Sequence, residues 1–217
     1  MKPADSSRDY HELVRQTYDR IAADYNRGRL EEFGDRRVLA PLFEGLPPGS
    51  QVLDLGCGAG VPMTQALAER YEVTGIDVSA EQIKLARQQV PNARFVQSDM
   101  THLDFSAETF DAVVSFFAIF HLPREEQPKL FGDIFDWLKP GGFFLATLAL
   151  EDEPGYTEDD FHGDEMYWSN FSREQYRSLL TDAGFELIDD YLLIDDPALT
   201  ASPETHPVFL ARRPKNY

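Results

Sequence analysis

The sequence has 217 residues, which is enough for one α/β domain with a sizeable core. Hydrophobic residues make up 42% of it, but no apolar run reaches about 18 residues, so no transmembrane helix and no membrane partner are expected. The 38 acidic and 20 basic residues give a net charge of −18. Such a charge disfavours nucleic acid as a partner, because phosphate binding relies on lysine and arginine.

The first residues, MKPADSSRDYHEL, lack the apolar core of a signal peptide. The single cysteine, Cys57, cannot form an internal disulfide and argues against chemistry that needs several thiols. Both features favour a cytoplasmic protein. The spacing of histidines and carboxylates does not indicate a metal site, so we expect no metal.

Two helices are expected before the first strand. The first covers residues 8–25, because apolar side chains recur there on one helical face, at Val14, Tyr18, Ile21, Ala22 and Tyr25. The second covers roughly residues 30–44 and ends at the turn Pro47-Pro48-Gly49.

From residue 52 onward, short apolar runs alternate with helical stretches. Strands are expected at residues 52–55, 73–76, 93–96, 110–116, 143–148, 185–193 and 208–212. Helices are expected at residues 62–70, from Ser79, at 124–138 and at 172–183, with capping boxes at Ser79/Gln82 and Ser172/Gln175. Five strand–helix units and a closing strand pair predict a doubly wound, mostly parallel sheet of seven strands. Ligands of such sheets bind beyond the carboxyl ends of the strands.

A glycine-rich loop follows the first of these strands. It reads Asp54-Leu55-Gly56-Cys57-Gly58-Ala59-Gly60, and glycine lets a backbone turn tightly and approach a ligand. Asp77 ends the next strand, where a carboxylate can accept hydrogen bonds from ribose hydroxyls. A dinucleotide fingerprint would have its third glycine where Val61 stands, which disfavours a nicotinamide-dependent oxidoreductase.

This loop resembles the acidic-x-Gly-x-Gly-x-Gly signature of class I S-adenosylmethionine-dependent methyltransferases. The resemblance continues in the loop Phe116–Leu122 and in the turn Leu138–Gly142. The segment Tyr18–Tyr25 resembles the helix that covers the cofactor in the small-molecule branch of the family. The resemblance implies a Rossmann-like fold and S-adenosylmethionine as the cofactor.

The resemblance also implies roles for particular residues. Asp77 would hold the ribose, and Asp99 would reach the adenine amino group. The cofactor-binding residues expected are Tyr18, Tyr25, Asp54, Gly56, Cys57, Gly58, Gly60, Asp77, Val78, Ser98, Asp99, Met100 and Phe116. Core packing is an equal alternative for Met100 and Phe117, and at least one of the two tyrosines is expected in the core.

On this basis we expect one methyltransferase domain over residues 1–217. Its expected parts are an N-terminal helical cap (1–45), a cofactor-binding core (46–150), a substrate flap (151–171), and a C-terminal helix with a strand pair (172–217). The flap is expected because the segment after the fifth strand is too long for a simple connection. Its alternative is a solvated acidic loop that aromatic residues anchor to the core.

Methyl transfer from a sulfonium is an in-line displacement, and a base helps when the acceptor must lose a proton. His121 is the candidate general base, because it follows the fourth strand and histidine titrates near neutral pH. The alternative is that His121 only orients its loop. The acceptor would contact Phe117, His121, Tyr167 and Trp168, whereas His162 and His206 have weaker positional support.

The expected function is transfer of a methyl group to an oxygen, nitrogen or sulfur atom of a small-molecule metabolite. The acidic flap favours an amine or a hydroxyl group, although its charge also serves solubility. A non-catalytic cofactor-binding module and a protein methyltransferase remain alternatives. A nucleic-acid methyltransferase is disfavoured, because no Asn-Pro-Pro-Tyr-like segment follows the fourth strand to hold a flipped base. The chain is expected to be a monomer or a homodimer.

Overall fold

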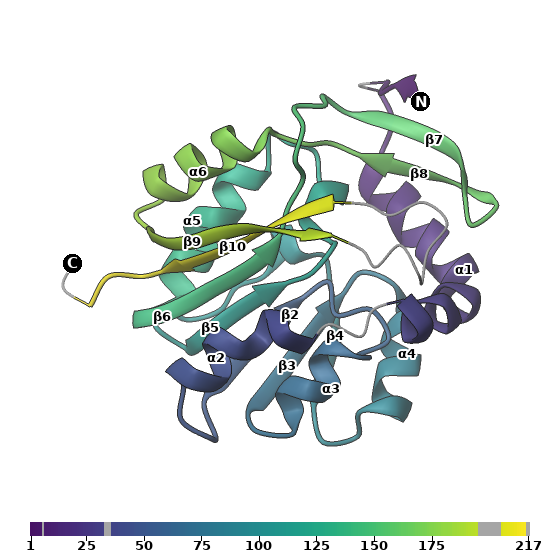
Figure 1. Ribbon diagram of the computed structural model, residues 1–217. Coiled ribbons are helices and arrows are strands. Elements are labelled where there is room, and N and C mark those ends of the chain that lie inside the picture. Colours follow the sequence, from purple (N-terminus) through teal and green to yellow (C-terminus); the bar gives the residue numbers. More distant parts are fainter. Residues whose placement is uncertain (6, 33–35, 195–204, 216–217) are drawn as a thin grey trace.

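A seven-stranded sheet organises the protein, and the computed structural model describes residues 1–5, 7–32, 36–194 and 205–215 (Figure 1). The strand order is β4-β3-β2-β5-β6-β10-β9. The parallel strands are β2 (Gln51–Leu55), β3 (Glu72–Asp77), β4 (Arg94–Gln97), β5 (Phe110–Ser115) and β6 (Leu138–Thr147). The closing pair is antiparallel and consists of β9 (Glu186–Ile194) and β10 (Thr205–Arg212). The predicted doubly wound, mostly parallel sheet of seven strands is confirmed.

Helices cover both faces of this sheet, which explains why its central strands are apolar throughout. One face packs against α5 (Gln127–Trp137) and α6 (Arg173–Asp182). The other face packs against α2 (Ala40–Gly45) and α3 (Met63–Ala68), and a smaller cluster joins α4 (Ala80–Gln89) to β4 (Figure 1). Within the described ranges, no helix is both long and apolar enough to cross a membrane.

Some element bounds differ from those expected. The first helix, α1, runs from Tyr10 to Glu32, so the prediction that a second helix starts near residue 30 is wrong. A 3-10 helix, Arg36–Leu39, leads directly into α2, which has proline in its first turn. Strand β6 begins at Leu138, so the expected turn at Leu138–Gly142 is part of the strand. Gly141, at φ +87°, donates a backbone hydrogen bond to the carbonyl oxygen of Arg213.

A second, three-stranded sheet was not expected from the sequence. It consists of β1 (Lys2–Pro3), β7 (Tyr156–Phe161) and β8 (Asp164–Trp168), in the order β1-β7-β8. The hairpin β7–β8 lies on α1, and Tyr10, Leu13 and Val14 of α1 share a small apolar cluster with residues of β8 (Figure 1). The predicted flap segment is therefore a hairpin that packs on the N-terminal helix, and its contact with a substrate stays a prediction.

Candidate functional site

The site lies at the carboxyl edge of the sheet, where the chain order reverses between β2 and β5. Gly56 and Gly58, directly after β2, have φ of +74° and +54°, which favour glycine. A Cβ on Gly56 would lie 2.2 Å from the Cβ of Ala118, so a side chain there would collide with the loop after β5. At Gly58 a Cβ would meet only the Gln82 Oε1 atom, at 3.9 Å, so the backbone there is open to a ligand.

Two carboxylates flank this loop. Asp77, at the end of β3, accepts hydrogen bonds from the backbone N–H groups of Gly58 and Ser79, each at 2.9 Å. Asp54 accepts a hydrogen bond of 2.6 Å from the Thr64 hydroxyl. Burial raises the pKa of Asp54 to about 7 and that of Asp77 to about 6, because desolvation penalises the charged form. The site therefore favours a cationic ligand, which would restore both negative charges.

Most of the sequence-predicted cofactor residues surround one cavity at this edge. Those that line it are Tyr18, Tyr25, Asp54, Gly56, Cys57, Gly58, Asp77, Val78, Ser98, Asp99, Met100 and Phe116. Phe117 and His121, predicted to contact the acceptor, line it as well. Gly60 does not; a Cβ there would instead meet Val90 and Phe95, so it lies behind the loop.

Sequence reasoning missed several residues that line the cavity. His11, Val14 and Asn26 come from α1, and the helical spacing that singled out Tyr18 and Tyr25 extends to all three. Gln82 is only 1% exposed, and its amide nitrogen and oxygen have no hydrogen-bond partner among the described residues. Ser79 caps α4 as expected, but the reciprocal bond from the Gln82 side chain is missing. A buried amide without a partner at a cavity wall indicates a polar ligand.

His121 is buried and lines the cavity next to Tyr18 of α1. Its Nδ1 lies 2.8 Å from the Tyr167 carbonyl oxygen, which can only accept, so Nδ1 carries the hydrogen. Its Nε2 is then an acceptor for the Tyr18 hydroxyl, 2.9 Å away. Burial lowers the pKa of His121 to about 4, so its ring is neutral at physiological pH. The expectation that it titrates near neutral pH is wrong.

The two flap aromatics do not line this cavity. The ring of Tyr167 stacks on Tyr10 of α1, with centroids 3.9 Å apart, and its backbone orients His121. Trp168 packs against Tyr156 and against the ring of His121, at centroid distances of 5.7 and 5.6 Å. They anchor the hairpin in this structure, and their contact with an acceptor stays a prediction.

Four acidic side chains of the flap form ion pairs within the chain. Asp152 forms an ion pair with Arg124 at 2.9 Å, and Asp159 forms one with Lys2 at 2.6 Å. Asp164 and Glu165 pair with Arg20 and Arg8 of the N-terminal region. These contacts support the alternative in which the flap charges are structural and solvated.

The fold, the glycine loop and Asp77 are together typical of nucleotide-type cofactor sites in doubly wound sheets. Residues 52–142 match the family described as "Methyltransferase domain". The chain is 34% identical over 175 residues to trans-aconitate 2-methyltransferase of Deinococcus radiodurans, covering 75% of this chain and 64% of that protein. It is 41% identical over 135 residues to "Sterol methyltransferase-like 2" of Botryococcus braunii, covering 57% of this chain and 34% of that protein.

A solved structure has the same fold over nearly the whole chain. The 1,6-didemethyltoxoflavin-N1-methyltransferase of Burkholderia thailandensis superposes with a TM-score of 0.74 at 23% identity, covering 98% of this chain and 94% of that one. These similarities support the resemblance to class I S-adenosylmethionine-dependent methyltransferases, whose cofactor is S-adenosylmethionine. It spans about a third of the length of the first curated relatives it matches.

Proposed function

We propose that this chain binds S-adenosylmethionine in the cavity at the carboxyl edge of β2 and β3 and transfers its methyl group to a small molecule. One observation carries the proposal. The cavity has the family's glycine loop and Asp77 on one wall, and the Tyr18–His121 pair on another. Groups that would bind the cofactor and groups that would accept a proton therefore line the same cavity.

The residues present fit the cofactor. Asp77 would hold the ribose hydroxyls, and the partnerless amide of Gln82 is a further donor and acceptor for the nucleoside. The open backbone at Gly58 allows close approach, and the two buried carboxylates favour a cation such as the sulfonium. Once bound, S-adenosylmethionine would supply both the methyl group and its own leaving group.

The chain's own contribution to the chemistry is positioning and proton removal. A hydroxyl or amine acceptor that takes a methyl group must lose a proton. The Tyr18 hydroxyl would accept this proton while passing its own to His121 Nε2. His121 Nδ1–H, held by the Tyr167 carbonyl, keeps the ring in the tautomer that can accept. Tyr18 and His121 therefore act as a pair, with Tyr18 nearer the acceptor.

The acceptor is assigned only as a small molecule with a hydroxyl or amine group. Similar proteins carry names with four different acceptors, a sterol, phosphoethanolamine, trans-aconitate and 1,6-didemethyltoxoflavin, so these names leave the choice open. The Tyr18–His121 pair supports a protic acceptor, because only such an acceptor needs a base.

Calorimetric titration with S-adenosylmethionine and S-adenosylhomocysteine tests the cofactor site. We expect micromolar affinity for both, lost in Asp77→Ala and retained in Asp104→Ala, a matched change at an exposed position. No binding to well-folded wild type would overturn the proposal.

An acceptor screen then separates an enzyme from a module that only holds the cofactor. Hydroxylated and amino-bearing small molecules are incubated with methyl-labelled cofactor, and label transfer is measured. Transfer to at least one class, reduced in His121→Gln, is the expected result. Tight cofactor binding without transfer to any acceptor would favour the non-catalytic module, and transfer to protein alone would favour a protein methyltransferase.

A further inference from the structure

Helix α1 contacts the rest of the protein in two different ways. Its N-terminal half shares an apolar cluster with Met166 and Tyr167 of the hairpin, which is separate from the two large clusters around the main sheet. Arg20 adds an ion pair to the hairpin. On the cavity side, printed polar contacts join α1 to the core, among them those of His11, Tyr18 and Asp19. Helix α1 thus packs on the hairpin with its apolar side chains and joins the core through polar contacts beside the cavity.

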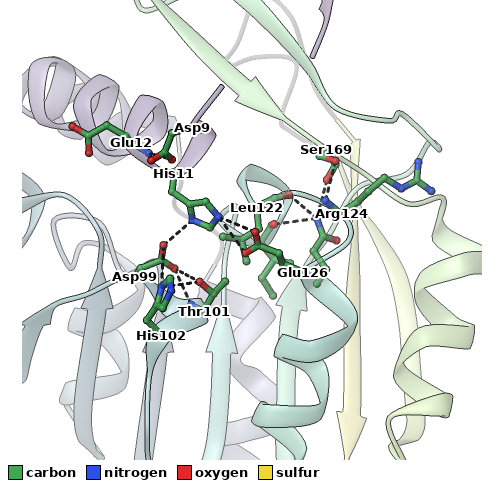
Figure 2. Close-up of polar contacts among 12 residues, drawn as sticks. Asp9, His11, Glu12, Asp99, Thr101, His102, Leu122, Arg124, Glu126 and Ser169 are labelled. Atoms are coloured by element: carbon green, nitrogen blue, oxygen red, sulfur yellow. Dashed lines mark hydrogen bonds and ion pairs between the residues drawn. The ribbon is translucent and has the colours of Figure 1, made fainter. Parts of the chain in front are cut away.

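His11 contacts two carboxylates of the core at once (Figure 2). Its Nδ1 lies 2.7 Å from Asp99 Oδ2, at the end of the β4 loop, and its Nε2 lies 3.1 Å from Glu126, at the start of α5. Both ring nitrogens face a carboxylate, and only the protonated imidazole donates from both. The pKa of His11 is accordingly raised to about 9, chiefly by the hydrogen bond to Asp99.

Asp99 connects this contact to the cofactor cavity. Its Oδ1 accepts two hydrogen bonds from Thr101, from the backbone N–H at 2.8 Å and from the hydroxyl at 2.7 Å. Its Oδ2 accepts from His11, and both residues line the cavity. Glu126 does not line it. The His11 imidazole on α1 therefore contacts Asp99, which lines the cavity, and Glu126, which does not.

We propose that His11 is a positioning residue that latches α1 over the cofactor cavity by bridging Asp99 and Glu126, so that release of the cofactor requires this bridge to break. The inference rests on the proposed cofactor site. It adds control of cofactor release by α1, which cofactor binding itself does not require. His11 acts through the position of α1 and through Asp99, and takes no part in methyl transfer.

The latch depends on the positive charge of the His11 imidazole. The charged groups around this imidazole set the pH range in which it stays protonated. Asp99 and Glu126 face the imidazole from the core, and Asp9 and Glu12 lie nearby on its own segment (Figure 2). His102 lies 3.7 Å from the same Asp99 oxygen. Since the pKa of His11 is raised from 6.5 to about 9, the latch is complete below about pH 6.5 and is lost as pH rises through about 9.

Two variants test the latch without altering the other cavity-lining residues. His11→Gln removes the charge, and Glu126→Gln removes the outer carboxylate while leaving His11 and Asp99 in place. Glu126 precedes α5 but makes no side-chain cap, so the helix start is preserved. The matched control is His102→Gln. This histidine also lies near Asp99, but its side chain is 79% exposed and it is not part of α1.

Two readouts are measured. Hydrogen exchange of the α1 backbone amides is measured without ligand. It should become about tenfold faster in His11→Gln, the effect of losing a hydrogen bond to a charged group, and faster by a smaller factor in Glu126→Gln, which keeps the contact to Asp99. It should stay unchanged in His102→Gln. The rate of S-adenosylhomocysteine dissociation should rise by a similar factor in the same two variants. The wild-type rate should increase above about pH 9, and that increase should be absent in His11→Gln.

The double variant should behave like His11→Gln, because Glu126 acts on α1 through the His11 imidazole. Unchanged α1 exchange and unchanged dissociation in Glu126→Gln would overturn the latch, as would an equal effect of His102→Gln. Wild-type protein that binds no S-adenosylhomocysteine would instead overturn the proposed function. The exchange experiment would still report on His11, because it uses no ligand.

Discussion

Burial changes what His121 can do chemically. Its lowered pKa makes it a weak base by itself, yet the same burial fixes its tautomer through the Tyr167 carbonyl and aligns Nε2 with the Tyr18 hydroxyl. Such fixed geometry favours proton transfer at the moment the charge develops, because the acceptor atom needs no reorientation. In the proposed mechanism, the Tyr18–His121 pair, more than the histidine alone, is the chemical unit.

Removing either partner should therefore have similar consequences. We expect Tyr18→Phe and His121→Gln each to lower kcat by about 100-fold, the usual range for loss of a general base. The double variant should be little worse than either single one. Steady-state kinetics with the acceptor found in the screen measures this. A Tyr18→Phe enzyme with wild-type kcat would contradict the paired role.

The two carboxylates beside the glycine loop make stability and cofactor binding depend on pH. Between about pH 4 and pH 7 the folded protein keeps protons on Asp54 and Asp77 that the unfolded chain has lost, because their pKa values are raised. Through these groups the free energy of unfolding of the ligand-free protein should fall as pH rises across that range. Urea titrations at pH 5 and pH 7.5 measure it, and Asp54→Asn should flatten the trend.

The same ionisation should accompany cofactor binding. At pH 6 we expect S-adenosylmethionine to release protons on binding, because its sulfonium stabilises the charged carboxylates. Calorimetry in two buffers of different ionisation heat detects the release. Asp54→Asn should reduce it, and Asp104→Asn should leave it unchanged. Binding heats that are equal in both buffers would contradict this prediction.

Among the elements, helix α6 has the clearest N-terminal signal. Ser172 and Gln175 exchange hydrogen bonds in the capping box that the sequence predicts. We expect Ser172→Ala to lower the free energy of unfolding by about 1 kcal/mol, measured by urea denaturation. Ser178→Ala, in the exposed interior of the same helix, should be neutral or slightly stabilising, since alanine favours a helix. Equal effects of the two changes would argue against the cap.

The helices and strands also show which parts of the structure could be predicted from the sequence. The seven sheet strands were predictable because short apolar runs alternate with helical spacing and each ends near a polar or glycine residue. The glycine loop, Asp77 and Asp99 followed from the same alternation together with the family resemblance. These signals are local, so they need no knowledge of distant contacts.

Other features depend on contacts between distant segments. The apolar residues of α1 find their partners in a hairpin more than 120 residues later, so the second sheet could not be inferred from spacing. Gln82 follows Ser79 by three residues, and the capping pattern concealed a side chain that faces the cavity. The pKa of His121 depends on burial that only the assembled fold provides.

At the scale of the whole molecule, the net charge of −18 opposes compactness through self-repulsion. We expect the melting temperature to rise as sodium chloride increases from about 20 to about 300 mM, since salt screens repulsion between exposed charges. A gain of about 1 kcal/mol corresponds to about 2–4 °C for a chain of this size. Scanning calorimetry measures it, and a falling melting temperature would mean that surface ion pairs outweigh the repulsion.

The separate apolar cluster of α1 and the hairpin has a consequence for synthesis on the ribosome. The segment containing Tyr10, Leu13 and Val14 emerges early, whereas Met166 and Tyr167 emerge after most of the parallel sheet. Until then the N-terminal half of α1 lacks these partners for its apolar side chains, and a chaperone that binds exposed apolar segments would have time to act. We expect nascent chains stalled before residue 150 to be cleaved by protease within α1, and chains extended well beyond residue 170 to resist.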